Sequence, residues 1–215
     1  MVDGSGLSAN KRKALSALGW LVLLAVLAAP FGITAHHFAT IFDSPDQTLL
    51  VLARLSSLIA MSFIFLEIVI GSFRPLLVKV YSPATLQRIH VTFGIAGLAF
   101  VLSHFILLIP ELAEHYGESN KVLFLVGPVA LVLLVLTVTT ALLSRRFKGS
   151  WRLLHLINYP VFVLAVAHGI VIGEDRSMLA LRLLFGGFVV VVLIGLAYRA
   201  SRPEWRALFK KRGPA

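Results

Sequence analysis

Hydrophobic residues occupy this chain in long unbroken runs that short polar segments separate. Six runs of roughly 20 residues each are long enough to cross a hydrocarbon core of about 30 Å as a helix. They cover residues 14–35, 48–73, 89–110, 122–143, 153–173 and 178–198. Residues that favour turns, such as Gly, Pro, Asp and Ser, fill the connections between the runs. This pattern predicts an all-α, polytopic membrane protein built as a bundle of six transmembrane helices.

The composition supports this fold class. The chain is 58% hydrophobic and only 14% charged, with a mean hydropathy of +0.90, which is far from the composition of an ordinary soluble domain. It contains no cysteine, which excludes disulfides, iron–sulfur clusters and thiolate-ligated heme. We expect a cytoplasmic tail over 1–13, the membrane domain over 14–198 and a basic cytoplasmic tail over 199–215. Any flavin- or nucleotide-binding module is then expected on a separate protein.

The charge distribution predicts the orientation of the bundle. There are 20 Lys and Arg against 10 Asp and Glu, giving a formal charge of +10. Most of the basic residues precede the first run, follow the last run or lie in the connections after the second and fourth runs. Most of the acids lie in the other connections. By the positive-inside rule, both termini are cytoplasmic, and we expect a multi-pass protein of the bacterial inner (plasma) membrane rather than a nucleic-acid-binding protein. The basic loops also attract anionic lipid, with an acidic cytoplasmic partner as the alternative.

Four histidines lie inside the predicted helices, where ionisable side chains are costly and indicate function. His90 and His104 are 14 residues apart in the third helix, and His155 and His168 are 13 residues apart in the fifth. At about 1.5 Å per residue, these histidines form two pairs at matched depths, His90 with His155 near the cytoplasm and His104 with His168 nearer the outside. Two imidazoles at one level suit the axial positions of a heme iron. Packing, proton transfer and other metals are the alternatives.

The spacing of the two histidines in the fifth helix does not place them on one face of an ideal helix. A spacing of 14 residues returns to within about 40° of the same helix face, but a spacing of 13 residues turns by about 220°. His155 and His168 would therefore lie on nearly opposite faces of an ideal helix. Pro160 lies between them and removes a backbone hydrogen bond. We therefore predict a kink or a wide turn near Pro160 that rotates the outer half of this helix.

The stretches LQRIHVTFGIAGLAFVLSHF and WRLLHLINYPVFVLAVAHG resemble the ferric reductase-like transmembrane domain, which ferric-chelate reductases, NADPH oxidases and stand-alone bacterial proteins share. The resemblance covers about residues 48–198. It implies two stacked b-type hemes, one held by His90 and His155 and the other by His104 and His168. It also implies that electrons pass from cytoplasmic NAD(P)H through a flavin to the inner heme, then to the outer heme and to an acceptor outside.

We accordingly expect an oxidoreductase component that carries electrons across the lipid bilayer. The donor is expected to be a separate cytoplasmic flavin reductase or membrane quinol, and the acceptor ferric iron, oxygen or a periplasmic reductase. Two alternatives remain. One is a heme-bearing, quinol-oxidising membrane subunit for a periplasmic reductase such as the methionine sulfoxide system, although that subunit usually lacks a histidine at the place of His90. The other is a heme-free transporter with His-lined proton or metal sites.

Three arginines are further candidates for the cofactor sites. Arg54 lies about two turns inside the outer end of the second helix, and the family carries an arginine at the matching place. We expect it to meet an outer heme propionate or to attract the outer acceptor, with snorkelling to the interface as the alternative. Arg88 and Arg152 lie close to the inner histidines in sequence. They are expected either to meet the inner propionates or to anchor the helices at the cytoplasmic interface.

The remaining ionisable residues have less specific interpretations. Glu67, in the inner half of the second helix, is expected to pair with a basic neighbour, with proton handling as the alternative. His36, His37 and His115 lie in the outer loops beside several carboxylates. We interpret them as ordinary loop polarity, and a surface that receives Fe(III) or another metal is the alternative.

Overall fold

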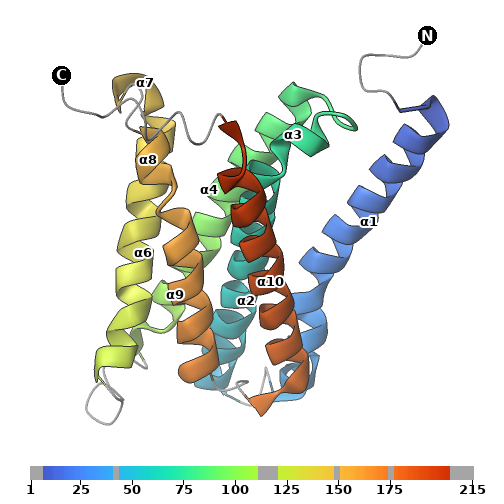
Figure 1. Cartoon of the computed structure of the whole chain (residues 1–215). Helices are drawn as coiled ribbons and strands as arrows, with labels where there is room; N and C mark the ends of the chain where they lie inside the picture. The colour runs from blue at the N-terminus through green and yellow to red at the C-terminus, as the bar shows by residue number, and fades with distance from the viewer. Residues whose placement is uncertain (1–6, 41–43, 111–120, 148–150, 174–176, 204–215) are drawn as a thin grey trace.

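The computed structural model describes residues 7–40, 44–110, 121–147, 151–173 and 177–203, and the regular structure in these ranges is helical (Figure 1). The long helices are α1 (Ala9–Thr34), α2 (Pro45–Ser72), α4 (Pro83–Leu107), α6 (Lys121–Leu142), α9 (Asn158–Val171) and α10 (Leu179–Ala200). The short ones are η1 (Ala35–Thr40), α3 (Arg74–Leu77), α7 (Ser144–Phe147) and α8 (Trp151–His155). With α8 and α9 counted as one segment, 6 helices of the described ranges are long and apolar enough to cross a membrane. The chain is therefore an integral, multi-pass membrane protein.

Serine caps set where three of the long helices begin. The side chains of Ser8, Ser44 and Ser82 accept a hydrogen bond from the backbone N–H three residues later. Pro45 and Pro83 follow two of these caps, at a position where the missing N–H of proline costs nothing. Because capping depends on these polar residues and not on hydropathy, α1 and α4 begin before the apolar runs that predicted them.

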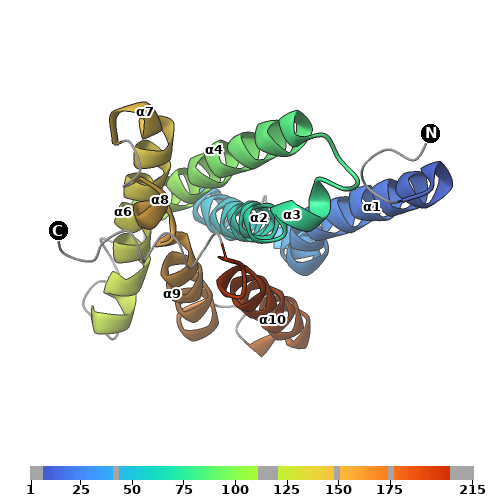
Figure 2. The same ribbon diagram turned by 45° about the horizontal axis from the view of Figure 1, so that its top comes forward.

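Helix α2 is the central element of the bundle. It packs against α1, α4, α9 and α10, which surround it in Figure 2. Within its most apolar stretch 50% of the residues are buried, against 6% in α1 and in α4. Phe65 of α2 stacks on Phe188 of α10 with ring centroids 3.9 Å apart, and Phe162 of α9 is fully buried. The core therefore lies around α2, while the large apolar side chains exposed on the outer helices form the surface expected for contact with lipid.

The two ends of the bundle differ in charge. Helix α1 begins and α10 ends at the same end, which also holds α3, α7 and α8 (Figure 1). We call this the basic end and the opposite one the far end. Described helices and turns place at the basic end Lys11, Arg12, Lys13, Arg74, Lys79, Arg88, Arg146, Arg152, Arg199 and Arg202, and nearer the far end Arg54 and Arg182. The cytoplasmic position of the basic end stays a prediction from the positive-inside rule.

Candidate functional site

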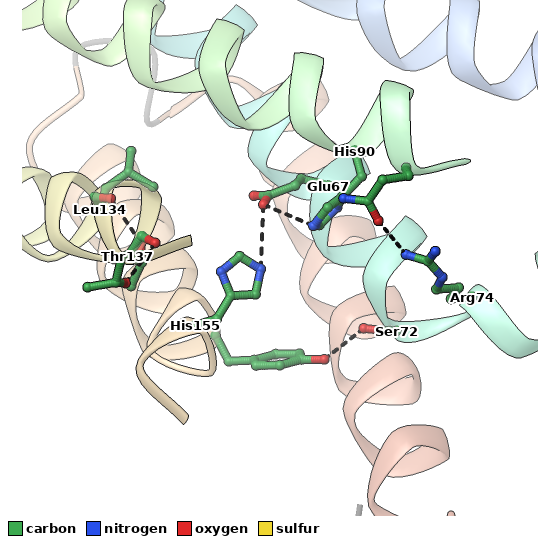
Figure 3. A network of polar contacts seen from close by, with 10 residues as sticks. Glu67, Ser72, Arg74, His90, Leu134, Thr137 and His155 are labelled. Atoms are coloured by element: carbon green, nitrogen blue, oxygen red, sulfur yellow. Dashed lines mark hydrogen bonds and ion pairs between the residues drawn. The ribbon is translucent and has the colours of Figure 1, made fainter. Parts of the chain in front are cut away.

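Three ionisable side chains from three helices meet in the half of the bundle nearer the basic end. The Glu67 carboxylate oxygen Oε1 on α2 lies 3.7 Å from His90 Nε2 on α4 and 3.8 Å from His155 Nε2 on α8 (Figure 3). The two imidazole ring centroids are 5.8 Å apart. These separations are longer than hydrogen bonds. The structure thus brings His90 and His155 together at one level, and Glu67 lies beside both of them, with Arg199 lining the same cavity. We call the three residues the inner cluster.

The surroundings of the inner cluster are polar and incompletely paired. A cavity of about 20 Å³ lies there, lined by Glu67, Ile68, Gly71, His90, His155, Asn158, Tyr159 and Arg199. Asn158 is only 4% exposed, and its Oδ1 has no hydrogen-bond partner among the described residues. The Tyr159 hydroxyl lies 2.7 Å from Ser72 Oγ and joins α9 to α2. Buried polar atoms without partners are rare in proteins, and a bound water or ion is one explanation for them.

The fifth span is interrupted between its two histidines. Helix α8 ends at His155, and the backbone N–H groups of Leu156 and Ile157 donate to the carbonyls three residues earlier, at 3.1 and 3.0 Å, in place of the α-helical pattern. Pro160 is the physical cause, because it has no N–H to donate to Leu156 and its ring would clash with that carbonyl. The predicted turn near Pro160 is confirmed. It allows His155 to face the inner cluster while His168, further along α9, lines a second cavity.

That second cavity, which we call the outer cavity, lies in the half of the bundle nearer the far end and has a volume of about 440 Å³. Sites for cofactors and small ligands commonly measure about 300–1,000 Å³. Its polar wall includes His104 of α4, His168 of α9 and Arg54 of α2. Most of the remaining wall is apolar, with Leu58, Met61, Ile64, Leu134, Val161 and Phe185 among its residues. The structure therefore brings the second predicted histidine pair to one site.

The backbone of α2 fixes the orientation of His104. Its Nδ1 lies 3.0 Å from the carbonyl oxygen of Ala53. A carbonyl oxygen only accepts, so Nδ1 carries the proton and donates it in this hydrogen bond. The neutral ring then keeps a lone pair on Nε2. A backbone hydrogen bond of this kind is the usual support for an imidazole that binds a metal.

Helix α6 makes room for His168 with a glycine. A Cβ atom at Gly127 would lie 2.7 Å from Cε1, 3.0 Å from Nε2 and 3.1 Å from Nδ1 of the His168 ring. Any larger residue would force the ring to move. Gly127 was not among the residues that the sequence singled out. The available signal was a small residue inside an otherwise bulky apolar run, which in membrane helices marks close approach.

Arg54 connects the outer cavity to η1. Its Nη1 lies 3.0 Å from Nδ1 and 3.1 Å from Nε2 of His37. An arginine only donates, so whichever ring nitrogen of His37 is unprotonated accepts the hydrogen bond. The structure thus brings His37 of η1 into contact with Arg54, which lines the cavity. The His36 side chain and His115 lie outside the described residues.

Arg88 and Arg152 do not reach either cavity. Both are exposed, and the Arg152 guanidinium lies over the Trp151 ring, 5.8 Å from its centroid. Arg88 precedes His90 by two residues, which turns it by about 200° around the helix. Their exposure at the basic end agrees with anchoring at the interface. It is Arg199 of α10 that lines the small cavity at the inner cluster.

The two histidine pairs differ in the group that they can accommodate. At the outer cavity, the donor set, the mostly apolar walls and the volume fit a heme. At the inner cluster, the Glu67 carboxylate lies within 3.8 Å of both imidazoles, and the cavity of about 20 Å³ holds one water-sized body. This arrangement does not fit a porphyrin. The two histidines that were predicted to bind the inner heme therefore lie side by side, but the site lacks the space for the porphyrin.

These sites define an integral helical membrane protein with two sites of half-buried histidines, one toward each end of the bundle. Comparisons with the models of known protein families, with curated proteins and with solved structures found no match. The resemblance to the ferric reductase-like domain thus stays a prediction, and the function has to be argued from the two sites.

Proposed function

We propose that this chain is a membrane cytochrome b that carries electrons from a donor at the basic end to an acceptor at the far end. The donor is a cytoplasmic flavoprotein or membrane quinol, and the acceptor is of the ferric iron or oxygen type. In this proposal the chain is the heme-bearing component of an oxidoreductase, and the electron-donor protein is separate.

The observation that carries the proposal is the outer cavity. It combines two imidazoles from different helices with mostly apolar walls and a volume of about 440 Å³ inside a membrane bundle. An ionisable residue within a membrane helix is a functional candidate by default. His104 in addition has the backbone hydrogen bond to Ala53 that leaves one ring nitrogen free to bind a metal. Packing alone does not explain a cavity of this size between the helices.

The residues of the outer cavity have separate roles in this mechanism. When bound, heme with two imidazole ligands takes up and gives back one electron and has no open position for a substrate. Ala53 holds the His104 ring, and Gly127 leaves the space that the His168 ring occupies. Arg54 supplies a positive charge at the wall, which offsets the carboxylates of the cofactor. The apolar walls keep water away and so tune the potential of the group they enclose.

The proposal gives the inner pair no role in electron transfer. A bis-His heme at His90 and His155 is what the resemblance implies, but the inner cluster has no space for one while Glu67 lies there.

The direct test uses vesicles that contain the purified, heme-loaded chain. Ferricyanide is trapped inside, and dithionite is added outside as a reductant that does not cross lipid. We expect reduction of the trapped ferricyanide well above that in protein-free vesicles and its loss in His104→Ala and His168→Ala. Ser103→Ala, an exposed neighbour of His104 on α4, is the matched control and should keep the wild-type rate. Wild-type vesicles that behave like empty ones would contradict the proposal.

One alternative has its own support in the structure. Three metal-binding side chains deep in a bundle also suit a heme-free transporter with a His-lined proton or metal site. A transporter would need no redox group in the outer cavity. Uptake of Zn²⁺ into vesicles by a chain that carries no heme would favour it, whereas heme in the outer cavity would exclude it.

A further inference from the structure

We propose that Glu67, His90 and His155 together bind a single divalent transition-metal cation, such as Zn²⁺ or Fe²⁺, in the half of the bundle nearer the basic end. This site is independent of the heme proposed for the outer cavity. It would give the chain two different metal centres, a heme iron nearer the far end and an ion held by protein ligands alone nearer the basic end.

The ligand set and its spacing support an ion. The three side chains offer one ligand atom each, and these atoms lie within 4.8 Å of one another. Two imidazoles and one carboxylate form a common ligand set of zinc and non-heme iron sites. With bonds of about 2.1 Å, tetrahedral ligands lie about 3.4 Å apart. The separations of 3.7 and 3.8 Å between Glu67 and the imidazoles therefore need to close by only a few tenths of an ångström.

Burial and charge provide a second argument. Glu67 is 5% exposed in the central helix, and an ionised carboxylate in such a place is costly unless a positive charge compensates it. Its described neighbours include two imidazoles at distances too long for hydrogen bonds, and Arg199 lines the same cavity. A divalent cation shared by the three side chains would compensate the carboxylate by direct contact and would satisfy the three ligand atoms at the same time.

Asn158 is an independent observation that points to a bound ligand. Its Oδ1 is buried without a hydrogen-bond partner among the described residues, and Asn158 lines the same cavity as the inner cluster. The cavity volume of about 20 Å³ matches one water-sized body. An amide oxygen accepts a hydrogen bond from a water on the ion, or binds the ion as an additional oxygen ligand.

Arg199 allows a test of whether the group bound at the inner cluster is a cation or an anion. Its side chain lines the same cavity, so its positive charge opposes a cation and would attract an anion. If the site binds a cation, Arg199→Gln strengthens binding. If the occupant were an anion, the same substitution would weaken it.

The experiment uses the full chain, purified in detergent, depleted of loosely bound metal with a chelator and then titrated with Co²⁺ or Zn²⁺. Bound metal is counted by elemental analysis, heme is counted separately, and the visible spectrum of Co²⁺ reports its ligands. We expect one divalent ion per wild-type chain, at least about tenfold weaker binding in Glu67→Gln and His155→Gln, and tighter binding in Arg199→Gln. Asp46→Asn is the matched control, because it removes an exposed carboxylate from the first turn of the same helix.

Several results would overturn the ion site. Among them are a wild-type chain that binds neither metal, equal weakening in Asp46→Asn and Glu67→Gln, and weaker binding in Arg199→Gln. Two hemes per chain, with one lost in both His90→Ala and His155→Ala, would also overturn it and leave the proposed cytochrome function intact. Conversely, a chain that binds the divalent ion but no heme would support the ion site and contradict the cytochrome proposal. The near-isosteric Glu67→Gln keeps the test valid if a histidine variant fails to fold.

Discussion

Gly127 provides a sharp test of the outer site, because a single methyl group added there collides with one proposed heme ligand. In Gly127→Ala the new Cβ would lie 2.7 Å from Cε1 of His168, whereas carbon atoms in contact are normally about 3.5–4.0 Å apart. The imidazole therefore has to move by about 1 Å. Overpacking of this kind costs about 1–3 kcal/mol, which corresponds to heme binding weaker by about 5- to 150-fold.

The assay separates this effect from a change in folding. Without heme the His168 ring is not held in place by iron and can rotate away from the new methyl group. Because alanine favours a helix over glycine by about 1 kcal/mol, Gly127→Ala should then unfold at the wild-type temperature or above. Gly187→Ala on α10 is the matched control, because a Cβ there meets nothing within 4 Å. Hemin is titrated into each heme-free protein, and the Soret band is followed. Wild-type affinity and spectrum in Gly127→Ala would refute the placement of His168 as a heme ligand.

Three further substitutions test the fold around the sites. Pro160→Ala should join α8 and α9 into one regular helix, rotate His168 away from the outer cavity and lower the heme content, and an unchanged heme content would contradict the role of the turn. Phe65→Ala should lower the free energy of unfolding in detergent by about 3–5 kcal/mol, and an equal loss in Phe31→Ala, whose ring is exposed, would argue against the core around α2. Tyr159→Phe removes one hydrogen bond between α9 and α2 and should cost about 1 kcal/mol in the same unfolding measurement, while no loss would show that this bond is dispensable.

The spans and the histidine pairs could be predicted because they depend on local periodicity. Hydropathy marks a membrane helix wherever about 20 apolar residues follow one another, and the described part of the chain contains six such helices. The levels of His90 and His155 follow from helix rise and direction alone. The position of Pro160 even predicted the turn that brings His155 and His168 to their separate sites.

The rest of the site depends on rotation and tertiary packing, which hydropathy does not encode. Glu67 was expected to pair with a basic neighbour, but a single helix does not reveal that it faces two histidines from other helices. The role of Gly127 depends on the packing of α6 against His168, which the sequence pattern does not show. The contact between Arg54 and His37 likewise joins a helix to a loop whose path the sequence pattern does not specify.

The most direct test of the central claim is the heme content and spectrum of the purified chain, with substitutions at His104. Wild type produced with sufficient heme should show a six-coordinate, low-spin heme b in the outer cavity. His104→Ala should lose it, and His104→Met should retain a heme whose potential is higher, because a thioether replaces one imidazole. A wild-type chain without a Soret band, or a heme whose spectrum and potential are unchanged in both variants, would contradict the account.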